Sequence, residues 1–280
     1  MKVQKLTPAI GAELSDIGID GAPDATTVNQ IYDELIKHQV MFITGEHISP
    51  QMHLSLAEAF GELQPVNPLY PHHRTSNKIM ILRSGANNPP DTGGWHTDIT
   101  YQQNPPFACL LVAREVPDCG GDTLWLSLSN AWESLPAGIQ SEIEELNAVH
   151  DMGDFRNNFT LKEPDATKLK EAHQQFGSAI HPLVKTHPVS GKRFLYINES
   201  FTQQIIGMRA TQSRRLLEFL FRHIEQPENQ VRYKWSNGTM AIWDNRCTSH
   251  YATTDYLPQS REMHRITVLN DLRAASRRSV

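Results

Sequence analysis

The stretch Trp95-His96-Thr97-Asp98-Ile99-Thr100-Tyr101 is rich in residues that favour β-strands, and it contains a His-x-Asp pair. On a strand, side chains two positions apart project from the same face, so His96 and Asp98 are expected to reach one metal ion together. Far downstream, Trp243-Asp244-Asn245-Arg246-Cys247-Thr248-Ser249-His250 ends in a third donor. Two histidines and a carboxylate are the facial triad that holds non-haem Fe(II) and leaves positions open for substrate and O₂.

Strand signals continue on both sides of this stretch. Short apolar or alternating runs predict strands at residues 40–44, 78–83, 108–116, 122–126 and 265–269. Turn residues between further apolar runs predict two hairpins, which join residues 180–186 to 193–198 and residues 231–235 to 239–243. The second hairpin rests on Asn237-Gly238, a strong hairpin signal.

Helices are expected between and before these strands. Apolar residues at helical spacing predict helices over residues 28–36, 131–146 and 214–224. Another helix should begin with Ser49 as its N-cap and Pro50 as its first residue, and should end at Gly61. Residues 62–95 and 151–178 are expected to be loop or insertion segments, and the first of them is expected to cover a substrate.

These elements together predict one domain over residues 1–280, mainly β with flanking helices. Strands joined by hairpins favour an antiparallel barrel or sandwich of the jelly-roll kind. A doubly wound parallel sheet would alternate strands with helices and would usually contain a glycine-rich phosphate loop. Neither GxGxxG nor GxxxxGK[ST] occurs in the chain.

The composition argues against several classes of partner. A net charge of −5 without a long basic run argues against nucleic acid and anionic membranes. No apolar run is long enough for a transmembrane helix, and the first residues lack the apolar core of a signal peptide. The three cysteines have no CxxC spacing and are expected to be reduced thiols of a cytoplasmic protein.

Some polar residues also have a plainer interpretation. Charged side chains are mostly exposed, so Arg261 and Arg265 could be strand-end charges on one shared face. Histidines in helical or loop contexts are expected on the surface, and these are His38, His47, His53, His173 and His223.

A series of short blocks occurs in order along the chain. They are His38-Gln39-Val40, Phe60-Gly61-Glu62-Leu63, Tyr70-Pro71-His72, Trp95-His96-Thr97-Asp98, Gly120-Gly121-Asp122-Thr123-Leu124-Trp125, His187-Pro188-Val189-Ser190-Gly191-Lys192, Trp243-Asp244-Asn245-Arg246 and His264-Arg265. In these blocks the chain resembles the taurine dioxygenase branch of the Fe(II)/2-oxoglutarate-dependent dioxygenases, over nearly its whole length. Many ordered blocks are far more specific than one His-x-Asp pair.

The resemblance implies a double-stranded β-helix, or jelly roll, and an Fe(II) centre held by His96, Asp98 and His250. It implies 2-oxoglutarate as co-substrate, with its far carboxylate bound by Thr123 and Arg261. A guanidinium group suits this task because it can hold a carboxylate through two charge-assisted hydrogen bonds. The implied reaction uses O₂ to decarboxylate 2-oxoglutarate to succinate and to hydroxylate a C–H bond of the substrate.

The implied substrate is a small organic anion, such as a sulfonate or an alkyl sulfate. Positions that match the family's substrate contacts are Tyr70, Phe159, Phe201 and Arg265, and Arg265 is expected to bind the anion. Asn67 stands where the family typically has a histidine, and Thr92 stands where it has an asparagine. A neutral amide in place of a protonatable imidazole predicts that taurine is a poor substrate.

Two other classes of protein remain open on the sequence. One is a metal-binding jelly roll without oxygenase activity, such as a cupin-like isomerase, which would bind iron without turning over 2-oxoglutarate. The other is a non-catalytic binding protein with no affinity for iron. The oligomeric state is open as well, and a homo-oligomer is compatible with the sequence.

Overall fold

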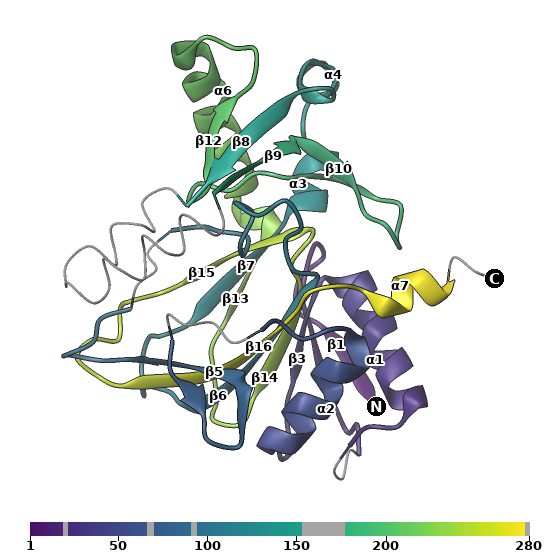
Figure 1. Cartoon of the computed structure of the whole chain (residues 1–280), viewed down its shortest axis with the longest axis vertical. Helices are drawn as coiled ribbons and strands as arrows, with labels where there is room; N and C mark the ends of the chain where they lie inside the picture. Colours follow the sequence, from purple (N-terminus) through teal and green to yellow (C-terminus); the bar gives the residue numbers. More distant parts are fainter. Residues whose placement is uncertain (19–21, 66–69, 91–93, 153–176, 278–280) are drawn as a thin grey trace.

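The computed structural model describes residues 1–18, 22–65, 70–90, 94–152 and 177–277 (Figure 1). Its largest element is an eight-stranded sheet in which only the β2–β3 pair is parallel among the described strands. In spatial order the strands are β1 (Lys2–Lys5), β2 (Ala12–Ser15), β3 (Val40–Ile43), β14 (Met240–Asp244), β6 (Ala108–Glu115), β16 (Arg261–Val268), β5 (Ser76–Ser84) and β4 (His72–His73). The three strands β14, β6 and β16 are buried along nearly their whole length.

A second sheet packs against one face of the large sheet. It consists of β13 (Gln230–Tyr233), β7 (Thr123–Ser127) and β15 (Thr248–Ala252). Aromatic rings from the two sheets form a shared core, in which Phe42 stacks on Tyr233 with ring centroids 3.7 Å apart. Trp125 lies edge-on to Trp243 at 5.8 Å. This aromatic layer removes a large apolar area from water and fixes the two sheets face to face.

Helices α1 (Ala25–His38) and α2 (Pro50–Phe60) pack on the opposite face of the large sheet (Figure 1). Along β6, Leu110 and Val112 face these helices, whereas Cys109 and Leu111 face the second sheet. This division follows from the alternation of side chains along a strand. The predicted start of α2 is confirmed, because the Ser49 side chain accepts a hydrogen bond from the Met52 amide and Pro50 is the first helical residue.

A third group of elements forms its own core at one end of the molecule (Figure 1). It contains a sheet of β12 (Thr202–Ile205), β8 (Asn147–Asp151) and β9 (Ser178–Pro182), the pair β10 (Val184–Thr186) and β11 (Arg193–Leu195), and helices α3 (Leu128–Glu133), α4 (Ala137–Ile143) and α6 (Ala210–Ile224). The helix predicted over residues 131–146 is divided in the structure into α3 and α4, and Pro136 is the N-cap of α4. Most of the predicted insertion, residues 153–176, lies outside the described residues.

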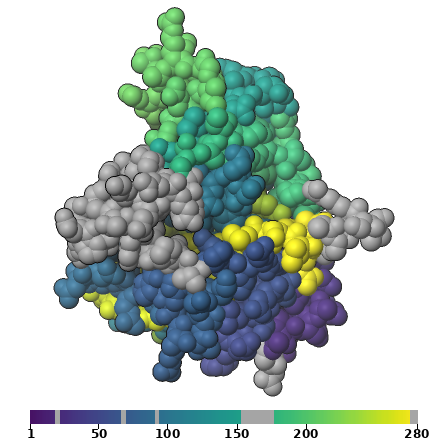
Figure 2. All heavy atoms as spheres, in the orientation of Figure 1, coloured from purple at the N-terminus to yellow at the C-terminus, as the bar shows by residue number. Residues whose placement is uncertain are grey.

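The C-terminal segment returns to the N-terminal helices. Helix α7 (Leu272–Arg277) lies beside α1 and α2, and Figure 2 shows this yellow segment against the purple and blue part of the surface. The Tyr32 hydroxyl donates to Asp271 at 2.7 Å, and Arg273 donates to the Ala59 carbonyl at 3.0 Å. These bonds tie the two ends of the sequence together. In the described part of the chain no helix is long and apolar enough to cross a membrane.

Both predicted hairpins are wrong in part. The turn at Asn237-Gly238 forms, with Gly238 at φ 88°, but the strands on its two sides belong to different sheets. Strand β13 pairs with β7, and β14 pairs with β3 and β6. The other hairpin is limited to β10 and β11, because residues 180–182 belong to β9 and pair with β8. A turn signal is local, whereas the pairing partner of a strand depends on the whole fold.

The predicted strand over residues 95–101 is also wrong. His96 makes a single bridge to His250, and the chain then turns at Asp98–Tyr101 with Ile99 at φ 58°. A β-branched residue rarely adopts this left-handed conformation, so strand propensity predicts the opposite. Three of the histidines expected on the surface are buried, namely His38, His53 and His223.

Candidate metal centre

Three side chains from distant parts of the chain meet between the two facing sheets. The ligand atoms of His96, Asp98 and His250 all lie within 4.8 Å of one another. Asp98 Oδ1 is 3.8 Å from His96 Nε2 and 4.0 Å from His250 Nε2. The backbones of His96 and His250 exchange two hydrogen bonds, of 3.0 and 2.8 Å, which hold the two imidazoles side by side. The structure therefore brings together the three residues that the sequence selected.

The turn that aims Asp98 is held by Asn245. The Asn245 side chain accepts from the Asp98 amide at 2.9 Å and donates to the Asp98 carbonyl at 3.1 Å. These bonds replace those that a neighbouring strand would supply, so the chain can turn without leaving buried backbone groups unpaired. Asn245 had no role in the sequence-based prediction, although its block Trp243-Asp244-Asn245-Arg246 carried part of the family resemblance.

The surroundings of Asp98 and His250 favour the protonation states that a metal requires. Burial would raise the pKa of Asp98, but the Arg265 guanidinium and the two histidines hold it well below its usual range. Burial and the neighbouring His96 hold the pKa of His250 well below its ordinary value. A carboxylate and a neutral imidazole are the forms that coordinate metal ions.

The donor set fits one transition-metal ion. Metal bonds to imidazole nitrogen and carboxylate oxygen are only about 2.0–2.2 Å long, so ligand atoms of one ion must lie this close. The His96 Nδ1–H donates to the Gly94 carbonyl at 3.0 Å, which leaves Nε2 as the free ligand atom. His250 Nδ1 is buried and has no hydrogen-bond partner among the described residues.

A second cluster of possible ligands is already satisfied by protein groups. His187, Asp244 and Cys247 are buried and close together. Both oxygens of Asp244 are used, because Arg246 donates to them at 2.8 and 2.5 Å and His187 donates at 2.9 Å. Burial raises the pKa of the Cys247 thiol well above its ordinary value. This cluster is therefore a buried ion-pair network and offers no free ligand atom on Asp244.

Arg261 lies between the two sheets, near the second sheet. Its side chain donates to the Gly121 carbonyl at 3.1 Å and to the Thr123 hydroxyl at 3.2 Å. Trp235 also donates to this hydroxyl, at 2.9 Å, and its ring lies 6.0 Å from the guanidinium carbon. Arg261 is only 8% exposed, and no carboxylate among the described residues forms an ion pair with it. The expectation of an exposed strand-end charge is wrong for Arg261.

Arg265 lies on the same strand, β16, and is also largely buried, with 14% of its side chain exposed. It donates to Asp98 Oδ2 at 2.7 Å and to the Cys109 sulfur at 3.1 Å. Phe201 is buried with its ring centroid 6.3 Å from that of His96. Tyr70 is half-buried. The remaining predicted substrate contacts lie outside the described residues, and these are Asn67, Thr92 and Phe159.

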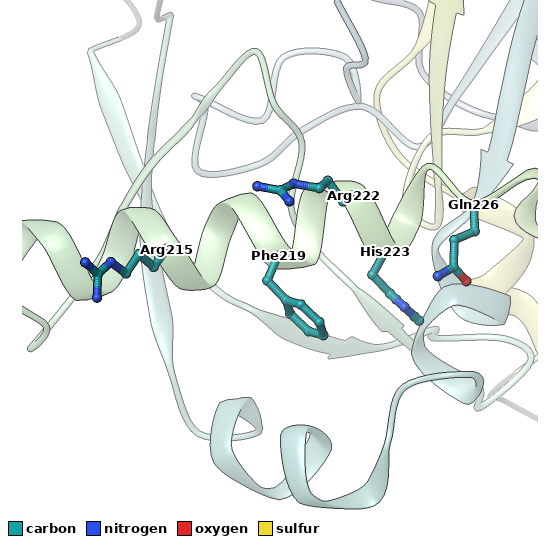
Figure 3. A pocket seen from close by; sticks show the side chains of 5 residues that line it. All are labelled: Arg215, Phe219, Arg222, His223 and Gln226. Atoms are coloured by element: carbon teal, nitrogen blue, oxygen red, sulfur yellow. The ribbon is translucent and has the colours of Figure 1, made fainter.

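A separate hollow runs along α6 on the outer surface (Figure 3). Its lining residues are Arg215, Phe219, Arg222, His223 and Gln226. The Phe219 ring is 43% exposed and stacks against the His223 ring at 6.3 Å. None of these residues belongs to the group of His96, Asp98 and His250, so the hollow is distinct from the candidate metal centre.

Fold and site together place a candidate mononuclear metal centre between two facing sheets. The family model for the taurine catabolism dioxygenase TauD, TfdA family matches residues 2–267. The chain is 34% identical to an alkylsulfatase from Acinetobacter baylyi, over 97% of this chain and 86% of that protein. It is 32% identical to an alpha-ketoglutarate-dependent sulfate ester dioxygenase from Pseudomonas putida, over 97% of this chain and 90% of that protein.

A crystal structure of a taurine dioxygenase from Burkholderia xenovorans has the same fold, with a TM-score of 0.80 and 32% sequence identity. The match covers 96% of this chain and 89% of that one. The chain belongs to the taurine catabolism dioxygenase TauD, TfdA family. It is an Fe(II)- and 2-oxoglutarate-dependent dioxygenase, as the resemblance in the sequence implied.

Proposed function

We propose that His96, Asp98 and His250 are the iron ligands of this dioxygenase. The proposal rests on one observation, the convergence of two imidazoles and one carboxylate within 4.8 Å in a buried place. When bound, the iron and 2-oxoglutarate supply the oxidising chemistry with O₂. The protein's own contribution is to orient the ligands, exclude water and position one C–H bond of the substrate. The indole rings of Trp125 and Trp243 lie beside His250 and exclude water from that side of the site.

We propose that Arg261 binds the far carboxylate of 2-oxoglutarate, with the Thr123 hydroxyl as a second donor. A buried guanidinium without a carboxylate partner has unmet demand for an anion, because a buried charge is costly unless it is paired. The carbonyl of Gly121 and the hydroxyl of Thr123 satisfy some of its N–H groups but contribute no negative charge. Trp235 fixes the Thr123 oxygen from the other side.

We propose that the primary substrate is an alkyl sulfate ester bound through its sulfate group to Arg265. Two relatives are named for activity on sulfate esters or alkyl sulfates, which favours this substrate class over taurine. Hydroxylation of the carbon that carries the sulfate would give an unstable product. That product collapses to an aldehyde and inorganic sulfate, and the co-substrate leaves as succinate and CO₂. The uncharged Asn67 and the short Thr92 are further reasons to expect discrimination against taurine.

The remaining substrate contacts belong to the same proposal. Phe201 packs on His96 and would border the C–H bond that is oxidised. Tyr70 and Phe159 are proposed as further walls of the substrate pocket. Family membership disfavours a metal-binding jelly roll without oxygenase activity and a non-catalytic binding protein.

We propose further that the two facing sheets form a double-stranded β-helix within a single domain over residues 1–280. Antiparallel pairing in both sheets supports this topology.

We also propose that the protein works in the cytoplasm, because its three cysteines are free thiols. The net charge of −5 supports the absence of nucleic acid and membrane partners.

A substrate screen tests the proposed substrate class. Iron-loaded enzyme is incubated with 2-oxoglutarate and, in turn, with alkyl sulfates of increasing length, alkyl sulfonates, taurine and aryloxyacetic acids. Succinate is measured in every reaction, and sulfate or sulfite is measured separately. We expect the highest kcat/KM and release of sulfate with an alkyl sulfate. If taurine is turned over better than every other anion, the proposed substrate class is wrong.

A further inference from the structure

The two oxygens of the Asp98 carboxylate have different surroundings. Oδ1 faces His96 and His250. Oδ2 faces away from the histidines and meets the Arg265 guanidinium at 2.7 Å and the Cys109 sulfur at 3.3 Å. Arg265 Nη2 also lies 3.1 Å from the same sulfur. Asp98, Arg265 and Cys109 therefore form a closed triangle of contacts.

Cys109 occupies this place because it lies on the inner face of a central strand. On β6 it is paired with Trp243 of β14 and with Thr267 of β16, and it is completely buried. Its sulfur lies within hydrogen-bonding distance of both Asp98 and Arg265, and a cysteine ordinarily carries its thiol proton at neutral pH. A thiol can donate its S–H to Asp98 Oδ2 and accept an N–H from Arg265 at the same time.

We propose that Cys109 is a positioning residue that sets the orientation of Asp98 and the reach of Arg265. Its S–H bond to Oδ2 keeps that oxygen turned away from the histidines and leaves Oδ1 for the metal. Its sulfur also gives Arg265 an acceptor that does not compete with a substrate anion. Arg265 Nε is buried and has no hydrogen-bond partner among the described residues, so the guanidinium can still bind an anion.

This inference extends the proposed function to the affinity of the enzyme for its substrate. It rests on the proposed roles of Asp98 and Arg265. Without the thiol, Asp98 Oδ2 loses one of the two contacts that orient it, and Arg265 has only the carboxylate as a close acceptor. The guanidinium then pairs more tightly with Asp98, and a substrate anion must compete with that carboxylate. Loss of Cys109 should therefore weaken both metal binding and anion binding, while the chemistry of the bound substrate changes little.

Three substitutions separate hydrogen bonding from packing. Cys109→Ser keeps a donor and an acceptor, Cys109→Val removes both and fills the site with a somewhat larger apolar side chain that suits a strand, and Cys109→Ala removes both and leaves a cavity. Cys119→Ser is the matched control, because Cys119 is an exposed thiol. Two quantities are measured for each variant. One is the Kd of Co(II) for the metal-free protein, and the other is the separate kcat and KM for the sulfate ester with iron and saturating 2-oxoglutarate.

The proposal predicts that Cys109→Val and Cys109→Ala each raise the Co(II) Kd and the substrate KM about three- to tenfold, as the loss of one hydrogen bond implies. The value of kcat should change less than KM. Cys109→Ser should recover most of both losses, and the control should match the wild type. The opposite order, in which Val matches the wild type and Ser does not, would show that Cys109 only fills space and would overturn the proposal. Unchanged values in all three variants would overturn it as well.

Arg265→Ala distinguishes failure of this inference from failure of the proposed function. If that variant keeps the wild-type KM for every anion tested, Arg265 does not bind the substrate and the proposed function fails at that residue. The Co(II) measurement then still tests the contact between Cys109 and Asp98 on its own. If Arg265→Ala raises KM strongly but Cys109→Val does not, only the positioning role of Cys109 is refuted.

Discussion

Arg261 donates a hydrogen bond of 3.2 Å to the Thr123 hydroxyl, although the two residues lie on strands of different sheets, β16 and β7. The contact joins the sheets at a point where a buried cation has no carboxylate partner among the described residues. Burial acts to lower the pKa of Arg261, but a guanidinium remains charged at any working pH. An anionic ligand at this point would neutralise the charge.

Arg261→Ala should weaken binding of 2-oxoglutarate much more than it changes binding of the metal. Loss of a charged hydrogen-bonding partner costs about 1.5–3 kcal/mol, or roughly 10- to 150-fold in affinity. The apparent constant for 2-oxoglutarate and the Co(II) Kd are measured on the same preparation. Arg83→Ala is the control, because Arg83 is exposed and pairs with Glu262 on the same strand as Arg261. An unchanged constant for 2-oxoglutarate would refute the carboxylate-binding role.

Alanine in place of His96, Asp98 or His250 should abolish iron-dependent turnover. Each of these residues supplies one of three protein ligands, so each loss should also raise the Co(II) Kd by a large factor. The fold should persist, which circular dichroism and thermal unfolding check. His47→Ala is the matched control, because His47 is exposed. Near-wild-type activity of any one variant at low iron would remove that residue from the ligand set.

The double substitution Asn67→His with Thr92→Asn should shift the preference of the enzyme toward taurine. A histidine can become cationic and an asparagine can contact an amine, whereas the residues present offer a neutral amide and a short hydroxyl. The measured quantity is the ratio of kcat/KM for taurine to that for the best alkyl sulfate. We expect this ratio to rise, and a ratio that stays constant would contradict the specificity role of both positions.

Lys185 should make stability depend on pH in the alkaline range. Burial lowers the pKa of Lys185 to about 8, whereas an unfolded lysine titrates near a pKa of about 10.4. Between these two values the unfolded chain binds a proton that the folded protein does not, so this residue's effect makes folding more favourable as pH rises. The buried ammonium group of Lys185 destabilises the folded protein fully below about pH 8, and this effect disappears above about pH 10.4.

Lys185→Met should therefore be more stable than the wild type at pH 7, by about 1–3 kcal/mol. The range allows for the loss of the contacts that the ammonium group makes with His181 and with the Tyr196 ring. The advantage should vanish near pH 10.5, and urea unfolding of both proteins at several pH values measures it. A difference that does not vary with pH would show that Lys185 has its ordinary pKa in the folded protein.

Several features of the fold could be predicted from the sequence because their causes are local. The Ser49 N-cap, Pro50 and Gly61 define α2 within a few residues, and they act through bonds that close inside the same turn. The apolar run of residues 108–116 predicts the central strand β6, because a strand that is buried on both faces has few polar positions. The ordered family blocks identified the ligand set, for which composition and periodicity alone gave only weak evidence.

The pairing of strands could not be read from the sequence. The Asn237-Gly238 turn is real, but β13 and β14 enter different sheets because their apolar faces are buried against different partners. The burial of His53 could not be read from the sequence either, because its Nε2 donates to the Leu110 carbonyl on a strand far away in the sequence. A helical histidine carries no local sign of such a partner.

The sequence by itself determined which residue types could form the metal centre and where β3, β6 and α2 begin. Only the tertiary structure decided how His96 and Asp98 converge, because they do so across a turn and not along a strand. That turn depends on Asn245, which lies 147 residues later and supplies both hydrogen bonds to the Asp98 backbone. The thiol of Cys109 beside Asp98 is likewise a product of strand pairing, since β6 reaches the site only as the neighbour of β14 and β16.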